Sequence, residues 1–379
     1  MIAYLDNAAT TQVWPEAAKA AAEAMTEGYF NPSSRYPGAV KAAKALEAHR
    51  GTVAKALGCT AKEIIFTSCG TESDNWAIRS AAEYGKRRGR HIITTAIEHH
   101  AVLEPIRDLE KNGYEVTYLK PNAQGTIDLG DLETALRADT VLVSMMLVNN
   151  ELGTVLPLQA ASQLIKRSGA PALLHCDAVQ GFLKVPFTPR ELGADLISIS
   201  GHKVHAPKGI GALYLKNGVK LKPFILGGGQ ESGLRSGTEP TAQIAAFAKA
   251  CELGLARRDK DIAHMLALKQ YALDRIAAEV PQVKPVVMGA APHVLALTMA
   301  GYKSEVLVRV LGDRGVCVSA GSACHRGKPS HVYAAMALSK AQRDGAFRVS
   351  FSGDSTKEDV DALIEGLKFA ARTLFPSMR

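Results

Sequence analysis

The chain has 379 residues, of which 47% are hydrophobic and 22% are charged, and its formal net charge is +8. This length predicts a large domain and a smaller one, with ample core for a stable soluble enzyme. No apolar run approaches the roughly 18 residues of a membrane helix, and the first residues lack the basic and apolar regions of a signal peptide, so we expect a cytoplasmic protein.

The net charge bears on binding partners, and the spacing of the cysteines bears on disulfides and metal sites. A basic surface favours anionic ligands, but the nearest approach to a basic cluster, GKRRGR at 85–90, has no interleaved aromatic residues. We interpret it as a solvated helix end leading into a strand, and direct nucleic-acid binding is a minor alternative. The six cysteines are dispersed and include no CxxC pair, which argues against a disulfide framework and a structural zinc site.

Short β-branched runs alternate with helical patterns from residue 63 to residue 215. Strands are expected at 63–68, 91–96, 115–120, 140–147, 172–178, 195–200 and 211–215. Several are apolar on both faces, and helical stretches such as 72–88 lie between many of them. This pattern is typical of a mostly parallel sheet covered by helices on both sides.

The pattern changes after residue 238. Two long helical segments are expected, followed by strands and helices in alternation, at 240–257, 259–280, 293–299, 303–314, 316–321, 347–352 and 357–373. We predict a large α/β domain over 15–255 and a smaller α+β domain formed by 1–14 and 256–379.

Two expected strands end in residues suited to amine and acid chemistry. Lys203 follows Ser-Gly-His at a strand end, where a partly desolvated lysine can condense with a carbonyl, although a surface lysine is as compatible with this segment. His202 and His205 have no carboxylate or cysteine at metal-ligand spacing, which disfavours a metal site. Asp177, followed by Gln180, ends an apolar strand. A buried acid there needs a partner such as a protonated ring nitrogen, and a helix cap or surface turn is the alternative.

Two glycine-containing segments are candidate phosphate contacts. Gly70 and Thr71 stand between a strand and a helix, whose first N–H groups favour an anion, although Thr71 would also be a good N-cap without a ligand. The Gly-rich stretch 227–238 carries Arg235 and Thr238, or is simply a flexible surface loop. No P-loop or GxGxxG motif is present.

A histidine and an arginine complete the candidate set. His99 follows a strand end, where it could lie against a planar ligand or shuttle a proton, although lone histidines are more often structural. Arg348 stands in a β-branched run of the smaller domain and needs a carboxylate opposite it, either from a substrate or from a structural acid.

Together these residues supply the functional groups that a pyridoxal phosphate site at strand ends needs. The chain resembles the cysteine desulfurases of the NifS and IscS type, in class V of the aminotransferase fold. The matching motifs, in chain order, are YLDNAATT, NPSSR, FTSCGTESDN, IEHHAV, VNNELGTV, CDAVQ, SGHKVHAPKGIGALY, RSGTEP and SAGSAC. The resemblance implies the fold type I architecture of pyridoxal-phosphate-dependent transferases, a pyridoxal 5′-phosphate cofactor and a homodimer.

The resemblance also implies a role for each matching position. Lys203 would bind the cofactor covalently and act as base, Asp177 would pair with the pyridine nitrogen, and Gln180 would reach the ring hydroxyl. His99 would stack on the ring and take part in catalysis. The implied phosphate contacts are Gly70, Thr71, Ser200 and His202, with Thr238 from the other subunit. The implied contacts to the substrate carboxylate are Asn150 and Arg348.

The implied reaction converts L-cysteine into L-alanine and leaves a persulfide on Cys324. Composition alone favours a buried filler, but Cys324 lies in a Gly/Ser segment beside His325, Arg326 and Lys328, which would favour the reactive thiolate. The sulfur would pass to an acceptor protein such as an iron–sulfur scaffold or a tRNA or cofactor thiolation enzyme.

The sequence departs from the family pattern at several places, which include Ala206 in place of a usual glycine and a missing arginine in FSGDSTKED, and two other functions stay open. The segment after Cys324 is shorter than in long-loop desulfurases, and Cys69, a candidate second thiol, replaces a usual glycine. A selenocysteine lyase or cysteine sulfinate desulfinase would need no protein nucleophile. A non-catalytic scaffold or nucleic-acid-binding protein on the same fold is the second alternative, which the intact Lys203 and Asp177 disfavour.

Overall fold

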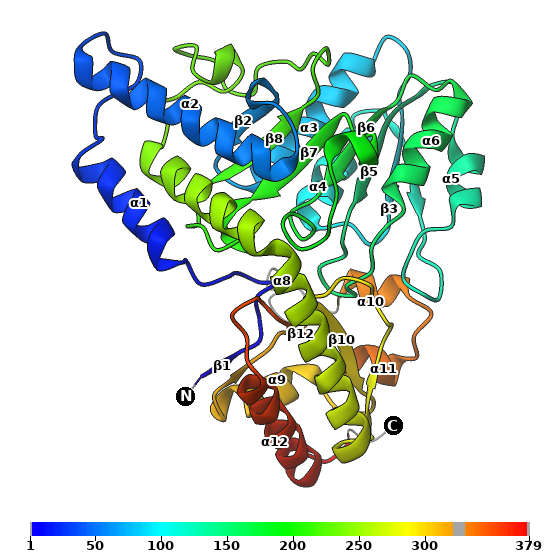
Figure 1. Cartoon of the computed structure of the whole chain (residues 1–379). Coiled ribbons are helices and arrows are strands. Elements are labelled where there is room, and N and C mark those ends of the chain that lie inside the picture. Colours follow the sequence, from blue (N-terminus) through cyan, green and yellow to red (C-terminus); the bar gives the residue numbers. More distant parts are fainter. Residues whose placement is uncertain (1, 321–329, 377–379) are drawn as a thin grey trace.

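A computed structural model describes residues 2–320 and 330–376, and no helix within these ranges is long and apolar enough to cross a membrane. Figure 1 shows a larger upper part built around one sheet and a smaller lower part, with the long helix α8 (Thr241–Glu279) running from one into the other. Residues from both parts line the cavity described below.

The larger part contains a seven-stranded sheet in the order β2-β8-β7-β6-β5-β3-β4. The strands are β2 (Ile64–Thr67), β3 (His91–Thr95), β4 (Glu115–Leu119), β5 (Thr140–Met146), β6 (Leu173–Asp177), β7 (Leu196–Ser200) and β8 (Gly211–Leu215). Neighbouring strands are parallel, except that β8 is antiparallel to both β2 and β7. All the strands expected between residues 63 and 215, and the mostly parallel sheet, are therefore confirmed.

Successive apolar residues of these strands enter two different cores, because side chains alternate across a sheet. In β2, for example, Ile64 and Phe66 pack on one face and Ile65 packs on the other. Helices α3 (Gly70–Gly85) and α4 (His100–Lys111) cover the Ile65 face. The helices that cover the opposite face are α1 (Pro15–Thr26), α2 (Pro37–Leu57), α5 (Leu129–Ala135), α6 (Leu158–Ser168), α7 (Pro189–Leu192) and the first part of α8. The basic stretch 86–90 joins the end of α3 to β3, as expected.

The smaller part has its own sheets and core. Its strands are β12 (Ala346–Ser350), β10 (Val294–Met299) and β9 (Val283–Pro285) in an antiparallel sheet, and β1 (Ala3–Tyr4) with β11 (Val316–Cys317) in a parallel pair. Helices α9 (Ser304–Asp313), α12 (Lys357–Thr373) and the second part of α8 pack against them. Two short helices, α10 (His331–Ala335) and α11 (Lys340–Asp344), complete the described fold.

The two helical segments expected at 240–257 and 259–280 form one helix of 39 residues. The expected interruption is wrong because the charged run between them contains neither Gly nor Pro, and Arg, Asp and Lys can all continue a helix. Ile244 near the start of α8 packs in the larger core, whereas Ile276 near its end packs in the smaller one. The domain boundary at 255 stays a prediction, since α8 passes through it unbroken.

Candidate active site

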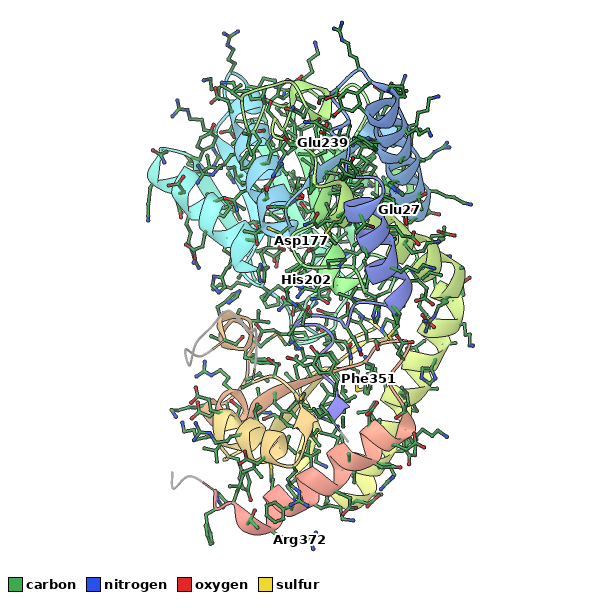
Figure 2. All side chains as sticks on the ribbon, turned by 90° about the vertical axis from the view of Figure 1, so that its left-hand side faces the viewer. Glu27, Asp177, His202, Glu239, Phe351 and Arg372 are labelled. Carbon is green, nitrogen blue, oxygen red and sulfur yellow. The ribbon has the colours of Figure 1, made fainter. Side chains whose placement is uncertain are left out.

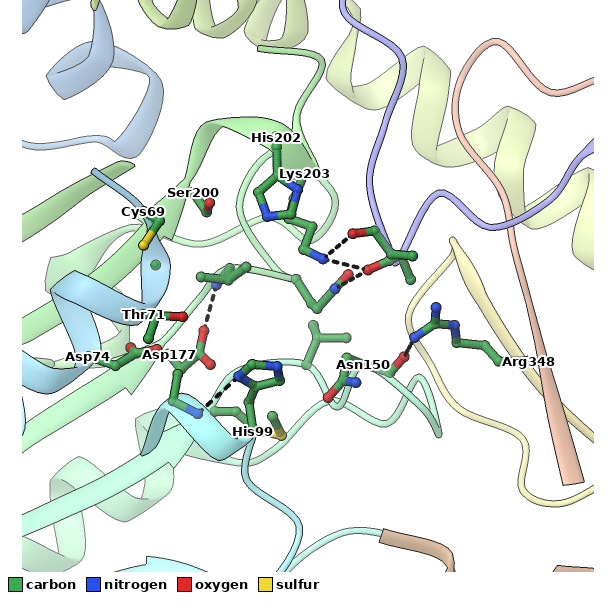
Figure 3. A pocket seen from close by; sticks show the side chains of 18 residues that line it. Cys69, Thr71, Asp74, His99, Asn150, Asp177, Ser200, His202, Lys203 and Arg348 are labelled. Atoms are coloured by element: carbon green, nitrogen blue, oxygen red, sulfur yellow. Dashed lines mark hydrogen bonds between the residues drawn. The ribbon is translucent and has the colours of Figure 1, made fainter. Parts of the chain in front are cut away.

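A cavity of about 210 Å³ lies at the carboxyl ends of β5, β6 and β7, where open α/β sheets commonly bind ligands. Figure 2 shows Asp177 and His202 at the level where the larger part meets the smaller one. Every predicted site residue except Thr238 and Cys324 lines this cavity. These residues are Gly70, Thr71, His99, Asn150, Asp177, Gln180, Ser200, His202, Lys203 and Arg348 (Figure 3).

Lys203 reaches the cavity because β7 ends at Ser200 and the chain makes a short 3-10 turn over Gly201–Lys203. The turn is tight, since a Cβ added to Gly201 would lie 2.8 Å from a methyl group of Ile210. The Lys203 amine donates hydrogen bonds to the carbonyl oxygens of Ala8 at 2.8 Å and Ala9 at 2.7 Å. The N-terminal segment therefore fixes the position of an amine carried by the larger sheet.

Asp177 is the last residue of β6 and is almost fully buried. Its Oδ1 accepts a hydrogen bond from the Val179 N–H at 2.9 Å. Burial, reinforced by the nearby Asp74 carboxyl, raises the pKa of Asp177 to about 7. Burial likewise raises the pKa of Asp74 to about 7. The cavity thus holds two acids whose charged forms would be stabilised by a bound cationic group.

The start of α3 forms the end of the cavity suited to an anion. The helix begins at Gly70, and Cys69 is its N-cap without a side-chain capping bond, so the alternative interpretation of Thr71 as N-cap is wrong. A Cβ on Gly70 would lie 2.7 Å from a Val179 methyl carbon, which leaves room only for glycine. The Ser200 hydroxyl is buried and has no hydrogen-bond partner among the described residues. The free N–H groups of the first helical turn and this hydroxyl could together hold a phosphate.

His99 and His202 are both held in defined orientations. His99 is the N-cap of α4, and its Nδ1 accepts a hydrogen bond from the Ala101 N–H at 3.1 Å. Nδ1 of His202 lies 3.2 Å from the Thr10 hydroxyl, and burial lowers the pKa of His202 to about 3, so its ring is neutral. His205, by contrast, stacks on Trp14 with the ring centroids 4.2 Å apart and has a structural contact.

Gln180 is anchored at both ends of its amide group. Its Nε2 donates to the Ala8 carbonyl oxygen at 2.9 Å, and its Oε1 lies 3.2 Å from the His293 ring nitrogen. Burial holds the pKa of His293 well below its ordinary value, so a neutral imidazole faces the amide. The amide therefore has a fixed orientation at the cavity wall.

Arg348 lies in β12 of the smaller part and is 1% exposed. Its Nη1 donates to the Asn150 carbonyl oxygen at 2.9 Å, and its Nη2 lies 2.7 Å from Asp6 Oδ1. Asp6 is thus the structural acid that the sequence left as one alternative. The buried Nε has no hydrogen-bond partner among the described residues, so the guanidinium is not fully satisfied.

Two predicted residues are not placed in this cavity. Thr238 lines a separate depression together with Glu231 and Arg235, and Figure 2 shows the adjacent Glu239 well above Asp177. Arg235 binds Glu72 at 2.9 Å, so within the described chain its partner is an acid of α3. Cys324 lies outside the described residues.

Sequence reasoning missed Asp6, Asp74 and the carbonyl groups of Ala8 and Ala9. Asp6, Ala8 and Ala9 belong to the YLDNAATT motif, which supported the resemblance but was given no role of its own. Asp74 stands four residues after Gly70, and helical spacing alone places the two on one face. Both signals were present in the sequence.

Comparison with known proteins relates the whole chain to one family. The aminotransferase class-V family matches residues 3–363. A cysteine desulfurase of Trichormus azollae is 41% identical over 368 residues, which cover 96% of this chain and 91% of that protein. A NifS-like protein of known structure superposes with a TM-score of 0.93 at 35% identity and covers 99% of this chain and 100% of that one. A structure of SspA in complex with cysteine has a TM-score of 0.80 at 33% identity and covers 93% of this chain and 99% of that one.

These matches include both parts of the fold and the cavity between them, so the likeness is not confined to single motifs. They confirm the α/β fold class and the resemblance drawn from the motifs. The chain therefore belongs to the aminotransferase class-V family and, within it, to the cysteine desulfurases.

Proposed function

We propose that the cavity at the ends of β5, β6 and β7 is the active site of a pyridoxal-phosphate-dependent L-cysteine desulfurase, which yields L-alanine and a persulfide on Cys324. The proposal rests on the meeting of three functional groups in one place. An amine (Lys203), a buried acid (Asp177) and a buried arginine (Arg348) from distant segments line one cavity. Each group is ambiguous alone, but the set matches the needs of this chemistry.

The residues fit pyridoxal phosphate on features of the cavity itself. The Lys203 amine can form the covalent link to the cofactor aldehyde. Asp177, which takes part in no salt bridge among the described residues, would gain a cationic partner in the protonated pyridine nitrogen. The unpartnered Ser200 hydroxyl and the first turn of α3 would receive the phosphate, and the His99 ring would lie against the cofactor ring.

When bound, pyridoxal phosphate supplies an electron sink conjugated to the substrate Cα. Lys203 would act as the base that removes the substrate Cα proton, through its Nζ. The carbonyl groups of Ala8 and Ala9 hold that nitrogen in position. Asp177 would keep the ring nitrogen protonated by pairing with it.

The substrate carboxylate would bind between Arg348 and Asn150. Arg348 is held by Asp6 and by the Asn150 carbonyl group, and its Nε has no partner in the described structure. The cysteine bound to SspA supports the same substrate class here. The Cys324 thiolate would then attack the substrate sulfur. A sulfur–sulfur bond forms, the substrate carbon–sulfur bond breaks with its electron pair kept on carbon, and protonation of that carbon gives alanine.

The persulfide would pass its sulfur to an acceptor protein such as an iron–sulfur scaffold or a tRNA or cofactor thiolation enzyme. Thr238, which lies apart from the cavity of its own chain, would complete the phosphate site of the other subunit in a homodimer. A cytoplasmic location stays a prediction.

The test is incubation of the purified holoenzyme with L-cysteine, with alanine, sulfide and the mass of the Cys324 peptide measured together. We expect alanine formation and the gain of one sulfur atom on Cys324, and we expect Cys324→Ala to abolish both. Undiminished alanine formation by Cys324→Ala would indicate elimination without a protein nucleophile, as in the reactions of selenocysteine lyases or sulfinate desulfinases. Absence of a yellow chromophore that depends on Lys203 would support a non-catalytic scaffold instead.

A further inference from the structure

The residues on the two sides of 321–329 are attached to different cores. On one side, the backbone of Ser319 exchanges two hydrogen bonds with Arg348 of β12, at 3.1 and 2.7 Å, and the preceding Val318 packs in the smaller core. On the other side, α10 packs Val332 and Tyr333 into the larger core. Cys324 therefore belongs to a connection that joins the two parts of the molecule.

Ser330 makes more contacts than a helix cap requires. As N-cap of α10, its hydroxyl accepts hydrogen bonds from the N–H groups of Val332 at 3.1 Å and Tyr333 at 3.2 Å. The same hydroxyl donates to Glu151 Oε2 at 2.6 Å. A hydroxyl has one proton to donate and two lone pairs to accept with, so all of its capacity is used. The bond to Glu151 is additional to the cap, and a bond to a carboxylate is stronger than one between neutral groups.

Glu151 is fully buried and stands next to the site of the substrate carboxylate. Its backbone N–H is fixed by the Asn149 side chain at 2.9 Å, and the preceding residue, Asn150, accepts the Arg348 hydrogen bond. Arg348 in turn holds the backbone of Ser319. Ser319 and Ser330, which lie on the two sides of 321–329, are thus hydrogen-bonded to the Arg348–Asn150 pair or to its immediate neighbour.

His331 gives the same end of the segment a second attachment, beside the ring-stacking histidine. Its Nε2 lies 2.8 Å from the Glu98 carbonyl oxygen, and its ring packs edge-on against His100 at 4.7 Å. Glu98 and His100 are the two chain neighbours of His99. The start of α10, at Ser330 and His331, is therefore placed relative to the substrate side and to the cofactor side of the cavity.

We propose that Glu151 and Ser330 are positioning residues for the sulfur-transfer step, whose hydrogen bond keeps the Cys324 segment in register with the bound substrate. The proposal rests on the proposed function. Glu151 and Ser330 would align the Cys324 thiol with the substrate sulfur. Arg348 and Asn150 would bind the substrate cysteine. Misplacing a nucleophile slows attack without weakening substrate binding, because the contacts that bind the substrate are unchanged.

The test compares Ser330→Ala with Ser339→Ala. Ser339 is the N-cap of α11, accepts a hydrogen bond from the Gln342 N–H at 3.2 Å and lies on a helix of similar length, so both variants lose a cap and only one loses the Glu151 contact. Holoenzymes are mixed with L-cysteine in a single turnover. The chromophore change reports cysteine binding, and mass spectrometry after alkylation reports the persulfide on Cys324.

We expect Ser330→Ala to form the persulfide about tenfold more slowly than wild type, the size expected for one lost hydrogen bond to a charged group, with cysteine affinity unchanged. Ser330→Thr should restore the rate, since threonine keeps both the donor and the cap, and Ser339→Ala should behave as wild type. Glu151→Gln should also slow persulfide formation, and it is the variant to compare with wild type if Ser330→Ala fails to fold.

Equal persulfide rates in Ser330→Ala and Ser339→Ala would overturn the positioning role, as would a wild-type rate in Glu151→Gln. A loss confined to cysteine affinity would also overturn it, because the pair would then act in binding. Failure of the wild-type protein to gain sulfur on Cys324 is a different result, and it would refute the proposed function together with this inference.

Discussion

Two buried arginines, Arg50 and Arg348, are partnered differently. Each guanidinium nitrogen of Arg50 has an acceptor: Nε binds Glu47, Nη1 binds Glu231 and the Ile64 carbonyl group, and Nη2 binds Glu231 again. Arg348 is more deeply buried, yet its Nε has no partner among the described residues. Buried polar groups in a folded protein are normally satisfied, so an arginine left incomplete beside a cavity indicates a ligand, whereas a complete one indicates structure.

The neighbourhoods of the two arginines support this distinction. Glu231 also accepts a hydrogen bond from the Phe66 N–H at 2.8 Å, so the Arg50 ion pair fastens the loop around 231 to the edge strand β2. In the cavity that Arg348 lines, the Ser200 hydroxyl is also unpartnered, and Asp177 takes part in no salt bridge among the described residues. Arg348, Ser200 and Asp177 all line the same cavity, whereas Arg50 does not.

The largest effect on stability is expected from breaking the buried ion pair between Arg50 and Glu231. Arg50→Met leaves Glu231 as a buried, unpaired carboxylate, which should lower the free energy of unfolding by about 3–5 kcal/mol. Catalytic efficiency of the folded fraction should change little, since Arg50 does not line the cavity. Urea unfolding and alanine formation measure the two quantities.

Arg137 provides the control for this variant. It pairs with Asp139 and Glu115 at the exposed surface, and Arg137→Met should leave stability nearly unchanged because exposed ion pairs contribute little. Equal destabilisation by the two substitutions would remove the basis for treating Arg50 as a buried structural pair.

The next effect is expected from the incomplete arginine. Arg348→Lys keeps the charge but loses the planar set of donors, so catalytic efficiency with L-cysteine should fall by roughly a hundredfold while the chromophore remains. Steady-state kinetics and the absorbance spectrum measure this. Full catalytic efficiency in this variant would show that the Arg348 guanidinium is not needed to bind the substrate. The distinction between Arg348 as a ligand-binding residue and Arg50 as a structural one would then be wrong.

The last prediction concerns the pH dependence of the stability of the cofactor-free protein. Burial raises the pKa of Asp177 to about 7 from a value near 4 in the unfolded chain, so the stability linked to its protonation is present below about pH 4 and is lost as the pH rises through 7. Asp177→Asn should therefore flatten the fall in unfolding free energy between about pH 4 and pH 7. Asp74, whose pKa is also about 7, leaves part of the slope in place.

The control for this measurement is Asp139→Asn. Arg137 holds the pKa of Asp139 below its ordinary value, so its contribution is lost only at acid pH and the slope between about pH 4 and pH 7 should not change. An unchanged slope in Asp177→Asn would mean that Asp177 is already paired without the cofactor.

The large sheet and most of the cavity lining could be predicted from the sequence. β-branched runs indicate strands such as 140–147. The motifs placed Lys203 and Asp177 at strand ends, and parallel strands bring their carboxyl ends together at one edge of the sheet. The break expected in α8 failed because a charged run looks the same at a helix end and in the exposed middle of a long helix. The capping interpretation of Thr71 failed because the chain enters the helix two residues earlier, at Cys69.

By itself, the sequence determined the strands, the family and the chemical equipment of the site, because these depend on local patterns of side chains and on residues adjacent in the chain. Only the tertiary structure decided which polar groups meet and which are left without partners. The electrostatic effect of Asp74 on Asp177, the support of Arg348 by Asp6 and the bond from Ser330 to Glu151 all join residues far apart in sequence. Such contacts depend on strand register and on how two cores pack together, and no local pattern specifies either.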